Sequence, residues 1–557
     1  MQKITKEAAA SFFRNHMVAI LGALVGIVTF LCIYGVHILN VTYTDWLLGG
    51  GDLTQNYLGW CFFRNSGWAF PIGQMDQIVY PNEASVIFTD SVPLMAVFFK
   101  LFRGILPEQF QYFGLWGLLC FAVQGIFGSL LIHHYVKRTA ESVVGSLFFI
   151  ITPVMLVQIS MHPALGAQWL ILAAFWLGLR RRALGWKKSA AGWALLGVLA
   201  AGIQLYFIPI CALILISFLL SDILRRFNYK SMLAGLISFL AAAVLMVALL
   251  GGFAHDHIPN ASILGQASFN LNGLFNAQGW SQVIDTLPVY GAKAEEGLAF
   301  PGTGVLFVLA VGAVTWLIRL VYRAAVKKER RPFHSGSEKK ENSAAYLILV
   351  AACVAVALSP IVTYDSAVVA QWEPPLWMEE LWSRVGLCGR FIWPVVYLII
   401  LGSVVFMEKE MPWEAMTAVL LVAVAVFQVS DGKWQLMQRQ VQFSTEYVYY
   451  SPLQDEKWEE WAQDGNMKHM VFVSYMVDDV DLINDLSAYA AQNHMSVNDF
   501  GSACQTMRLE AAEDLLPILT DVQEDTLYIY KESDRAMCVN PDMEYTEVDG
   551  LIVGTAK

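Results

Sequence analysis

The stretch of sequence best suited to chemistry lies between residues 40 and 110, where carboxylates stand among aromatic residues and glycines. Asp52 follows three consecutive glycines, whose backbone freedom would let the chain aim a carboxylate into a cavity. Asp52 and Asp90 could instead cap the helices that follow them, as Asp does frequently. The two interpretations are compatible, because a capping loop can also present its second carboxyl oxygen. The acids between residues 42 and 94 are Asp45, Asp52, Asp76, Glu83 and Asp90.

Three further polar residues lie at the edges of apolar stretches. Arg384 and Arg390 precede one such stretch, and an alternative to ligand binding is that they snorkel towards water or pair with Glu379 and Glu380. His162 lies in a short turn between two apolar stretches, where a hydrogen-bonded structural role is the alternative to a substrate contact.

The composition restricts the class of protein. Of the 557 residues, 56% are hydrophobic and 15% are charged, and the mean hydropathy is +0.50. Soluble domains are about 45–50% apolar and about 25% charged, so a soluble enzyme, a disordered chain and a fibrous repeat are excluded. The eight cysteines show no CxxC and no metal-ligand spacing, which argues against a disulfide framework or a zinc module.

Charge divides the chain into two parts. Residues 431–557 contain 24 acidic and 8 basic residues, a net charge of −16, so residues 1–430 carry a net charge of +5 within the total of −11. We therefore expect a membrane domain over residues 1–430 and a soluble, acidic, extracytoplasmic domain over residues 431–557. Nothing in this pattern indicates nucleic-acid binding.

Apolar stretches predict eleven membrane crossings, since about 20 mostly apolar residues span a hydrocarbon core. Basic clusters flank both ends of residues 190–220, and two crossings with a turn near residues 204–209 place both clusters in the cytoplasm. Residues 91–106 are short and contain Lys100 and Arg103, so we expect an interfacial helix there. The predicted spans are 17–39, 111–133, 142–158, 164–179, 190–220 (twice), 230–253, 302–322, 344–361, 391–406 and 412–429.

The same charge rule orients the chain in a plasma membrane. Basic residues before the first span predict a cytoplasmic N-terminus, and an odd number of crossings predicts an extracytoplasmic C-terminus. The outer face then receives long loops at residues 40–110, 254–301 and 362–390, where a membrane enzyme can build an aqueous site.

The periodicity of the acidic tail changes along its length. It predicts helices over residues 455–464, 479–493 and 507–519, and strands over residues 468–475 and 526–530. We therefore expect a small α/β domain without a recognisable nucleotide or metalloprotease motif.

Four segments carry a family resemblance: GDLTQNYLGWCFFRNSGWAFPIG, YPNEASVIFTDSVPL, FQYFGLW and GRFIWPVVY. With the long first outer loop, its early acid and a proline-led interfacial helix, they resemble the GT-C superfamily of polytopic membrane glycosyltransferases, in particular a bacterial GT-C-like family. The resemblance implies a mainly α-helical GT-C-like fold and transfer of sugar from a polyprenyl-phosphate carrier to a cell-envelope glycan or glycolipid.

The resemblance also implies roles for individual residues. An inverting transfer needs a general base, for which Asp52 is the first choice and Asp90 the second. A phosphate leaving group favours planar bidentate cations, which Arg384 and Arg390 provide, with Arg64 as a further candidate. His162 and Gln55 complete the expected substrate contacts. Asp52 belongs to no DxD or DD pair, so a tightly bound metal is not indicated, although Mg²⁺ or Mn²⁺ remains compatible with so acidic a loop.

Two other functions compete with this one. A lipid or saccharide transporter would place isolated charges or paired broken helices in mid-span, and the sequence shows neither. A non-catalytic envelope scaffold or binding protein would keep the fold without needing Asp52.

Overall fold

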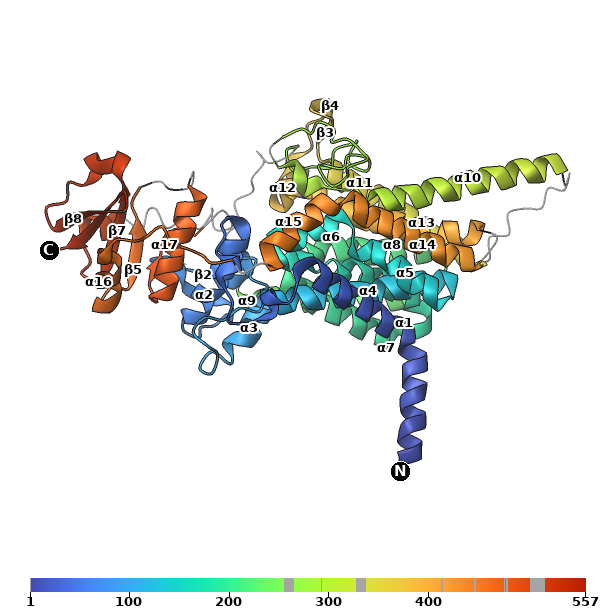
Figure 1. The fold of residues 1–557 in the computed structure, drawn as a ribbon, viewed down its shortest axis with the longest axis horizontal. Helices are drawn as coiled ribbons and strands as arrows, with labels where there is room; N and C mark the ends of the chain where they lie inside the picture. The colour runs from blue at the N-terminus through green and yellow to red at the C-terminus, as the bar shows by residue number, and fades with distance from the viewer. Residues whose placement is uncertain are drawn as a thin grey trace.

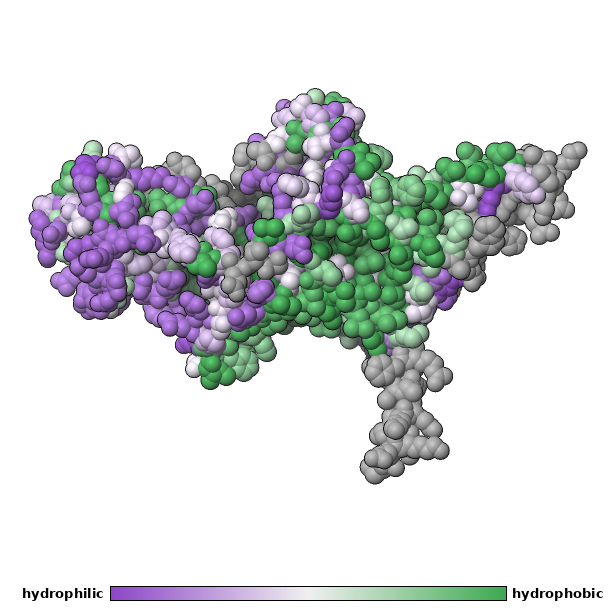
Figure 2. All heavy atoms as spheres, viewed as in Figure 1, coloured by the Kyte–Doolittle hydropathy of each residue, from purple (hydrophilic) through white to green (hydrophobic). Residues whose placement is uncertain are grey.

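The protein, seen here as a computed structural model, is a bundle of helices with a smaller α/β domain at one end (Figure 1). The structure describes residues 2–557 apart from 255–264, 292, 327–336, 412–413, 445–446, 475, 477–478 and 501–515. The surface of the bundle is largely hydrophobic and that of the α/β domain largely hydrophilic (Figure 2). The predicted class, a mainly α-helical polytopic membrane protein with a C-terminal α/β domain, is confirmed.

Helical structure is present at each of the eleven predicted spans. By length and apolar composition, six of the described helices could cross a membrane, or up to eight if each of two bent pairs forms one span. The bundle comprises α1 (Gln2–Tyr34), α4 (Phe113–Val136), α5 (Thr139–Ile150), α6 (Pro153–Met161), α7 (Trp169–Ile203), α8 (Phe207–Leu224), α9 (Lys230–Leu250), α10 (Thr303–Val326), α11 (Ser337–Leu358), α13 (Trp393–Glu410), α14 (Glu414–Asp431) and α15 (Lys433–Ser444).

Helix α7 is two antiparallel helices joined at Gly185. This glycine has φ 70° and ψ 165°, outside the helical region. A Cβ atom on Gly192 would lie 2.9 Å from Leu177, whereas these residues would stand about 22 Å apart in a straight helix. The reversal falls within the basic cluster of residues 180–188, and the next turn lies between α7 and α8, where the charge pattern predicted one.

The stretch from residue 40 to residue 110 folds into short elements at one end of the bundle. Its only α-helix beyond α2 is α3, whose eight residues extend about 12 Å and are too short to cross a membrane. Phe98, Leu101, Phe102 and Ile105 expose apolar side chains in and just after α3, as expected for an interfacial segment. The elements are η1 (His37–Leu39), η2 (Asp45–Leu47), α2 (Gly51–Asn65), β1 (Gln74–Val79), β2 (Asn82–Ser85), η3 (Val86–Phe88) and α3 (Pro93–Lys100).

Two other connections reach the same end of the bundle. The first, between α9 and α10, contains η6 (Ala294–Gly297), and the second, between α11 and α13, contains the antiparallel hairpin of β3 and β4. The elements of the second connection are β3 (Ile361–Tyr364), β4 (Ala367–Gln371), α12 (Leu376–Val385) and η7 (Cys388–Ile392).

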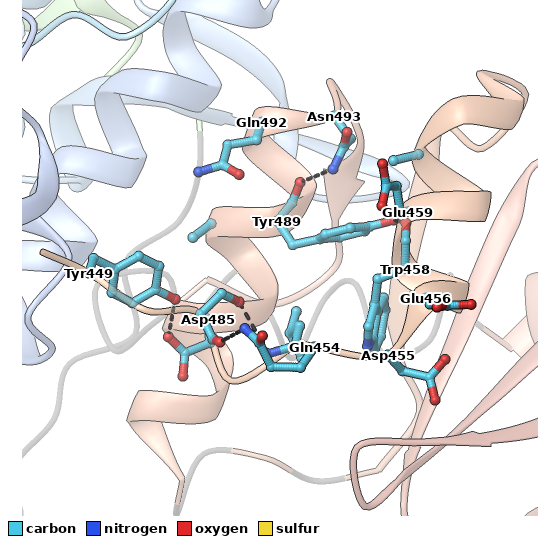
Figure 3. A pocket seen from close by; sticks show the side chains of 14 residues that line it. Tyr449, Gln454, Asp455, Glu456, Trp458, Glu459, Asp485, Tyr489, Gln492 and Asn493 are labelled. Atoms are coloured by element: carbon cyan, nitrogen blue, oxygen red, sulfur yellow. Dashed lines mark hydrogen bonds between the residues drawn. The ribbon is translucent and has the colours of Figure 1, made fainter.

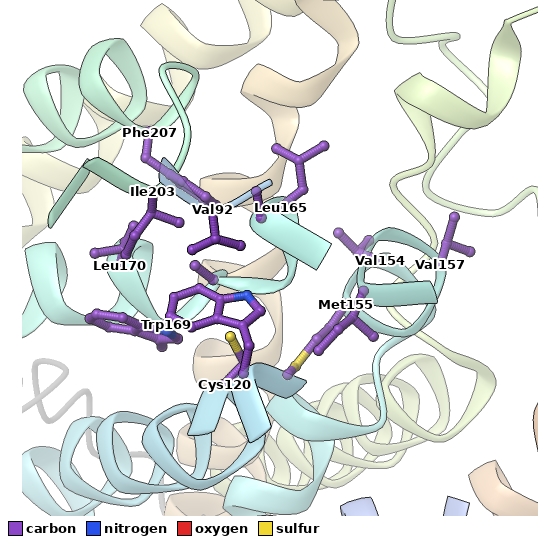
Figure 4. Close-up of a cluster of buried hydrophobic side chains, with 14 of the residues drawn as sticks. Val92, Cys120, Val154, Met155, Val157, Leu165, Trp169, Leu170, Ile203 and Phe207 are labelled. Atoms are coloured by element: carbon purple, nitrogen blue, oxygen red, sulfur yellow. The ribbon is translucent and has the colours of Figure 1, made fainter. Parts of the chain in front are cut away.

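A buried apolar cluster anchors the loops at this end. Figure 4 shows Val92, Leu165, Ile203 and Phe207 gathered with Trp169, and all five side chains are buried. Each of the first four lies within three residues of a polar side chain of the candidate site described below. Close packing leaves such a cluster little freedom, so it holds those polar side chains in place.

The C-terminal domain contains one mixed sheet in the order β6-β5-β7-β9-β8. Strand β5 pairs in parallel with β6 and β7, while β9 pairs antiparallel with β7 and β8. Its elements are α16 (Glu456–Asp464), β5 (His469–Phe472), α17 (Val480–Gln492), β6 (Ser496–Val497), β7 (Thr526–Lys531), η9 (Glu532–Met537), β8 (Met543–Val548) and β9 (Leu551–Ala556).

Four of the five elements predicted for this domain are present, namely α16, β5, α17 and β7. The predicted helix over 507–519 lies mostly outside the described residues. Strands β6, β8 and β9 were not predicted, because β6 has two residues and the other two are amphipathic only in part.

The C-terminal domain packs against the first loop rather than standing apart. The backbone N–H of Tyr80 donates to the carbonyl of Val497 at 2.9 Å, and the Tyr80 ring stacks on His469 with centroids 3.9 Å apart. Helix α15 falls within the predicted tail, but it packs on the bundle, where the rings of Phe443 and Tyr34 lie 5.3 Å apart. The sheet domain therefore begins after α15.

Candidate functional site

His162 is the centre of a polar cluster to which six segments of the chain contribute. It lies between α6 and η4 (Pro163–Gly166), and its side chain is 13% exposed. Its Nε2 atom is 3.4 Å from an Asp52 carboxylate oxygen and 3.8 Å from one of Glu296, and its Nδ1 atom is 3.8 Å from one of Asp90. One imidazole thus lies within ion-pair distance of three carboxylates.

Asp52 is the most exposed carboxylate of the cluster, with 44% of its side chain accessible. It lies in the first turn of α2, where the helix dipole favours negative charge. The alternative that Asp52 caps this helix is wrong: the N-cap is Gly50, which has φ 96°, and Gly51 follows with φ 66°. These positive φ values favour glycine, so the backbone bend predicted before Asp52 is present at Gly50 and Gly51.

Asp90 is held by an unusual backbone. Asp90 and Val92 have φ values of 53° and 52°, a conformation that costs energy for a β-branched residue such as valine and persists only where the surroundings enforce it. The α3 N-cap is Val92, so Asp90 is not a cap either; instead it accepts a hydrogen bond from the Gln204 side chain. Burial raises the pKa of the Asp90 carboxyl above its usual range, and the positive field of His162 and Arg390 opposes this shift only in part.

Glu296 and Arg390 form a buried ion pair beside His162. The Nε and Nη2 atoms of Arg390 lie 2.9 Å and 2.8 Å from the same Glu296 oxygen, Oε2, which leaves Oε1 for His162. The guanidinium also lies over the Tyr206 ring, 4.4 Å from its centroid. Burial tends to raise the pKa of Glu296, but Arg390 and His162 outweigh it and hold that pKa below the usual range.

Two glycines permit this pairing. A Cβ atom on Gly389 would lie 2.6 Å from the Cα atom of Gly297, closer than any side chain allows. Because the two backbones touch there, their neighbours Arg390 and Glu296 are brought together across two connections that are distant in sequence.

The structure thus brings together four of the seven residues predicted for the site: Asp52, Asp90, His162 and Arg390. Arg64 is used elsewhere, because its guanidinium donates to the carbonyls of Glu108 at 2.7 Å and Leu106 at 3.2 Å and so braces the loop after α3. Gln55 is half-buried on α2, one turn after Asp52. Arg384 lies in α12, and its side chain is outside the part of the chain that the structure describes.

Three residues of the cluster were not predicted: Glu296, Gln204 and Tyr206. Glu296 lies in the predicted outer loop 254–301 within a Glu-Glu-Gly sequence, which by itself reads as a solvated surface segment. Gln204 and Tyr206 lie in the predicted turn before α8. Two polar residues between two apolar spans were the signal in the sequence that could have marked them as site residues.

The donor set does not match a metal site in this arrangement. Among the described residues, no group of three or more His, Cys, Asp or Glu side chains is placed to hold a metal ion. The Oε2 atom of Glu296 is already bonded to Arg390, and one oxygen of Asp90 to Gln204.

Comparison with known proteins finds two family models and a solved structure. The model described as "Domain of unknown function (DUF6311)" matches residues 23–433, and that described as "DUF6311 C-terminal domain" matches residues 457–556. The fold is similar to a crystal structure of the Archaeoglobus fulgidus oligosaccharyltransferase tethered with an acceptor peptide, with 14% identity and a TM-score of 0.42 over 98% of this chain and 75% of that chain. Among curated proteins, none matches the chain.

Proposed function

The chain belongs to the DUF6311 family, and we propose that this member is a membrane glycosyltransferase. It would move a sugar from a polyprenyl-phosphate-linked donor to a glycan or glycolipid acceptor of the cell envelope, on the extracytoplasmic face of the plasma membrane. One observation carries the proposal: an exposed carboxylate, Asp52, is joined through His162 to a buried arginine at the end of a helical bundle.

Asp52 is the general base of the proposed reaction. The acceptor hydroxyl oxygen attacks the anomeric carbon of the donor, its proton passes to the Asp52 carboxylate, and the bond between that carbon and the phosphate oxygen breaks with its electron pair on the phosphate. Asp52 suits this step because it is the most exposed carboxylate of the cluster and can meet an acceptor hydroxyl from the aqueous side.

Arg390 would stabilise the departing lipid phosphate. Two of its five N–H donors are used by Glu296, which leaves three for phosphate oxygens. A charge-assisted contact of this kind is stronger in a buried site than in water, and the Arg390 side chain is only 4% exposed. The negative charge of Glu296 balances the guanidinium and keeps Arg390 in place until the phosphate arrives.

His162 and Asp90 are positioning residues in this scheme. His162 lies 3.4–3.8 Å from the carboxylates of Asp52, Asp90 and Glu296, so it would orient the Asp52 carboxylate in the proposed reaction. Asp90, bonded to Gln204, lies on the Nδ1 side of the imidazole at 3.8 Å and would attract that side of the ring when His162 is protonated.

The direct test compares cell-envelope glycans by mass spectrometry in cells with and without the gene. Deletion should remove one specific sugar, and the wild-type gene should restore it. Asp52→Asn keeps the size of the side chain but removes the base, so it should express and fold normally while restoring about 1% or less of the sugar, since general bases contribute about 10²–10⁴-fold.

The matched control is Asp76→Asn, an exposed acid of the same loop on β1, which should restore the sugar fully. A fully active Asp52→Asn protein would eliminate Asp52 as the base. The same two variants distinguish an enzyme from a scaffold or binding protein, for which neither substitution should matter. They also distinguish it from a transporter, for which substitutions in mid-span should have the larger effects.

A further inference from the structure

The C-terminal domain contains a cavity of about 350 Å³, within the usual size range of small-molecule sites. Its walls are the linker of residues 449–455, α16 and α17 (Figure 3). Tyr449 comes from the linker, Trp458 and Glu459 from α16, and Asp485 and Tyr489 from α17. The cavity is distinct from the His162 cluster, because the two share no residue.

Aromatic rings form part of the lining and are held rigidly. The rings of Trp458 and Tyr489 meet edge to face with centroids 5.1 Å apart, and the Tyr489 hydroxyl donates to the Trp458 carbonyl at 2.6 Å. The Tyr449 hydroxyl donates to an Asp485 carboxylate oxygen. Half-buried tyrosines fixed in this way present an apolar surface with a polar edge, which suits the C–H face of a sugar ring.

The polar part of the lining accepts hydrogen bonds much more than it donates them. Ionised carboxylates only accept, amide side chains do both, and the described lining residues include no Lys, Arg or His. An anionic ligand would therefore meet like charge, whereas an uncharged polyol can donate its hydroxyls to the carboxylates. The carboxylate and amide side chains are Asp455, Glu456, Glu459, Asp485, Gln454, Gln492 and Asn493.

Two of the three walls of the cavity, α17 and the linker, are bonded to the loop that carries Asp52. On α17, the side-chain amide of Asn484 donates to the carbonyl of Gly51 at 3.4 Å, one residue before Asp52 and beside Asp485. In the linker, the backbone N–H of Tyr449 donates to an Asp45 oxygen at 3.3 Å. The position of the cavity relative to Asp52 is therefore held by hydrogen bonds to Asp45 and Gly51 of this loop.

We propose that this cavity binds an uncharged saccharide chain. The assignment of that saccharide to the non-reacting part of the acceptor rests on the proposed transferase activity, whereas the binding itself does not. Aromatic rings for sugar faces, carboxylates and amides for hydroxyls, and the absence of basic residues from the described lining together select this ligand class.

The test is binding of the full chain, reconstituted in lipid nanodiscs, to an array of neutral, phosphorylated, uronic-acid and amine-bearing oligosaccharides. The wild-type protein should bind neutral oligosaccharides preferentially. Titration with the best neutral oligosaccharide should then show at least about tenfold weaker binding for Glu459→Gln and for Asp485→Asn, because each loses a charged acceptor.

The matched control is Glu460→Gln, an exposed acid on α16 outside the cavity lining, which should bind within about twofold of wild type. Thermal unfolding of every variant checks that the fold is kept. The proposal is overturned if wild-type protein binds no neutral oligosaccharide, if it prefers anionic or amine-bearing ones, or if folded Glu459→Gln and Asp485→Asn proteins both bind like wild type.

Asp52→Asn separates this proposal from the proposed function. It should bind the neutral oligosaccharide as wild type does, because Asp52 does not line the cavity. If Asp52→Asn turns out to be active in transfer, the catalytic proposal fails while saccharide binding still stands or falls on the array.

Discussion

Two buried arginine–carboxylate pairs in the bundle look alike in composition and differ in how their charges are used. Arg181 on α7 binds Asp222 on α8 through two bonds to two different oxygens, Nε to Oδ2 at 2.8 Å and Nη2 to Oδ1 at 2.9 Å. Arg390 instead directs both of its bonds to one oxygen of Glu296, and the other oxygen faces His162.

The difference separates a structural pair from one suited to chemistry. In the Arg181–Asp222 pair both oxygens are bonded, so the pair acts as a clamp between two helices. In the Arg390–Glu296 pair the free oxygen extends the charge network to His162 and onward to Asp52. The arm of α7 between Trp169 and Gly185 extends about 24 Å, which places the two pairs at opposite ends of the bundle.

The largest effect we expect is an all-or-none difference in labelling from outside the cell, because the two ends of the bundle should lie on opposite sides of the membrane. A cysteine-bearing tag after Lys557 should react with a membrane-impermeant maleimide in intact cells, and Trp186→Cys, beside the Gly185 reversal, should react only after permeabilisation. The untagged chain measures the background from native cysteines, because Cys32 is exposed. The opposite labelling pattern would place the Arg390 end in the cytoplasm and remove the basis of the proposed function.

Among the substitutions considered, breaking the Arg181–Asp222 pair should cost the most stability. Asp222→Asn leaves Arg181 buried at 3% exposure without a full counterion, and we expect a loss of about 3–5 kcal/mol in the free energy of unfolding. Thermal unfolding in detergent measures it. Arg182→Ala is the control: Arg182 lies 3.7 Å from Asp222 but is 41% exposed, so its loss should cost less than about 1 kcal/mol.

Substitution of Glu296 in the Arg390–Glu296 pair should reduce sugar transfer more than it reduces stability. Glu296→Gln keeps an oxygen for Arg390, and Asp90 supplies negative charge nearby, so we expect a smaller loss, of about 1–2 kcal/mol. Transfer, measured as the sugar restored to deletion cells, should fall at least about tenfold because His162 loses a partner. A Glu296→Gln protein as unstable as Asp222→Asn would show that both pairs are structural clamps.

The smallest expected effect is a pair of opposite pH dependences. The raised pKa of Asp90 means that its contribution to stability is present at low pH and lost as pH rises; the lowered pKa of Glu296 means that its contribution is lost as pH falls. Relative to wild type, Asp90→Asn should therefore gain stability as pH increases from acidic to neutral, and Glu296→Gln should lose it. Thermal unfolding across that range checks both signs, and equal slopes for the two variants would contradict the charge assignment.

Local pattern predicted much of the fold. The apolar stretches coincide with helical structure, and the short stretch 91–106 contains only α3, because membrane burial is decided by composition over a window of about 20 residues. The tail elements α16, α17 and β7 followed from periodicity in the same way. Strands β8 and β9 were missed, since their pairing depends on the sheet they join and not on their own sequence.

The candidate site was predictable in part, for a reason that individual residues make clear. Asp52 and Arg390 were identified because a glycine run and the entrance of a span mark them locally. Arg64 was indistinguishable from a ligand-binding arginine until the structure placed it against two backbone carbonyls. Glu296 had no local mark, because its neighbourhood reads as a solvated loop.

The sequence by itself determined a multi-pass helical protein with an acidic α/β tail, and it identified the loop that holds Asp52. Only the tertiary structure decided that His162 would join Asp52 to Glu296 and Arg390, because that junction depends on the backbone contact of Gly297 with Gly389. Hydrophobic burial is read over neighbouring residues, whereas an ion pair needs two particular atoms within 4 Å. Contacts between distant segments of that precision arise only when the whole bundle has packed.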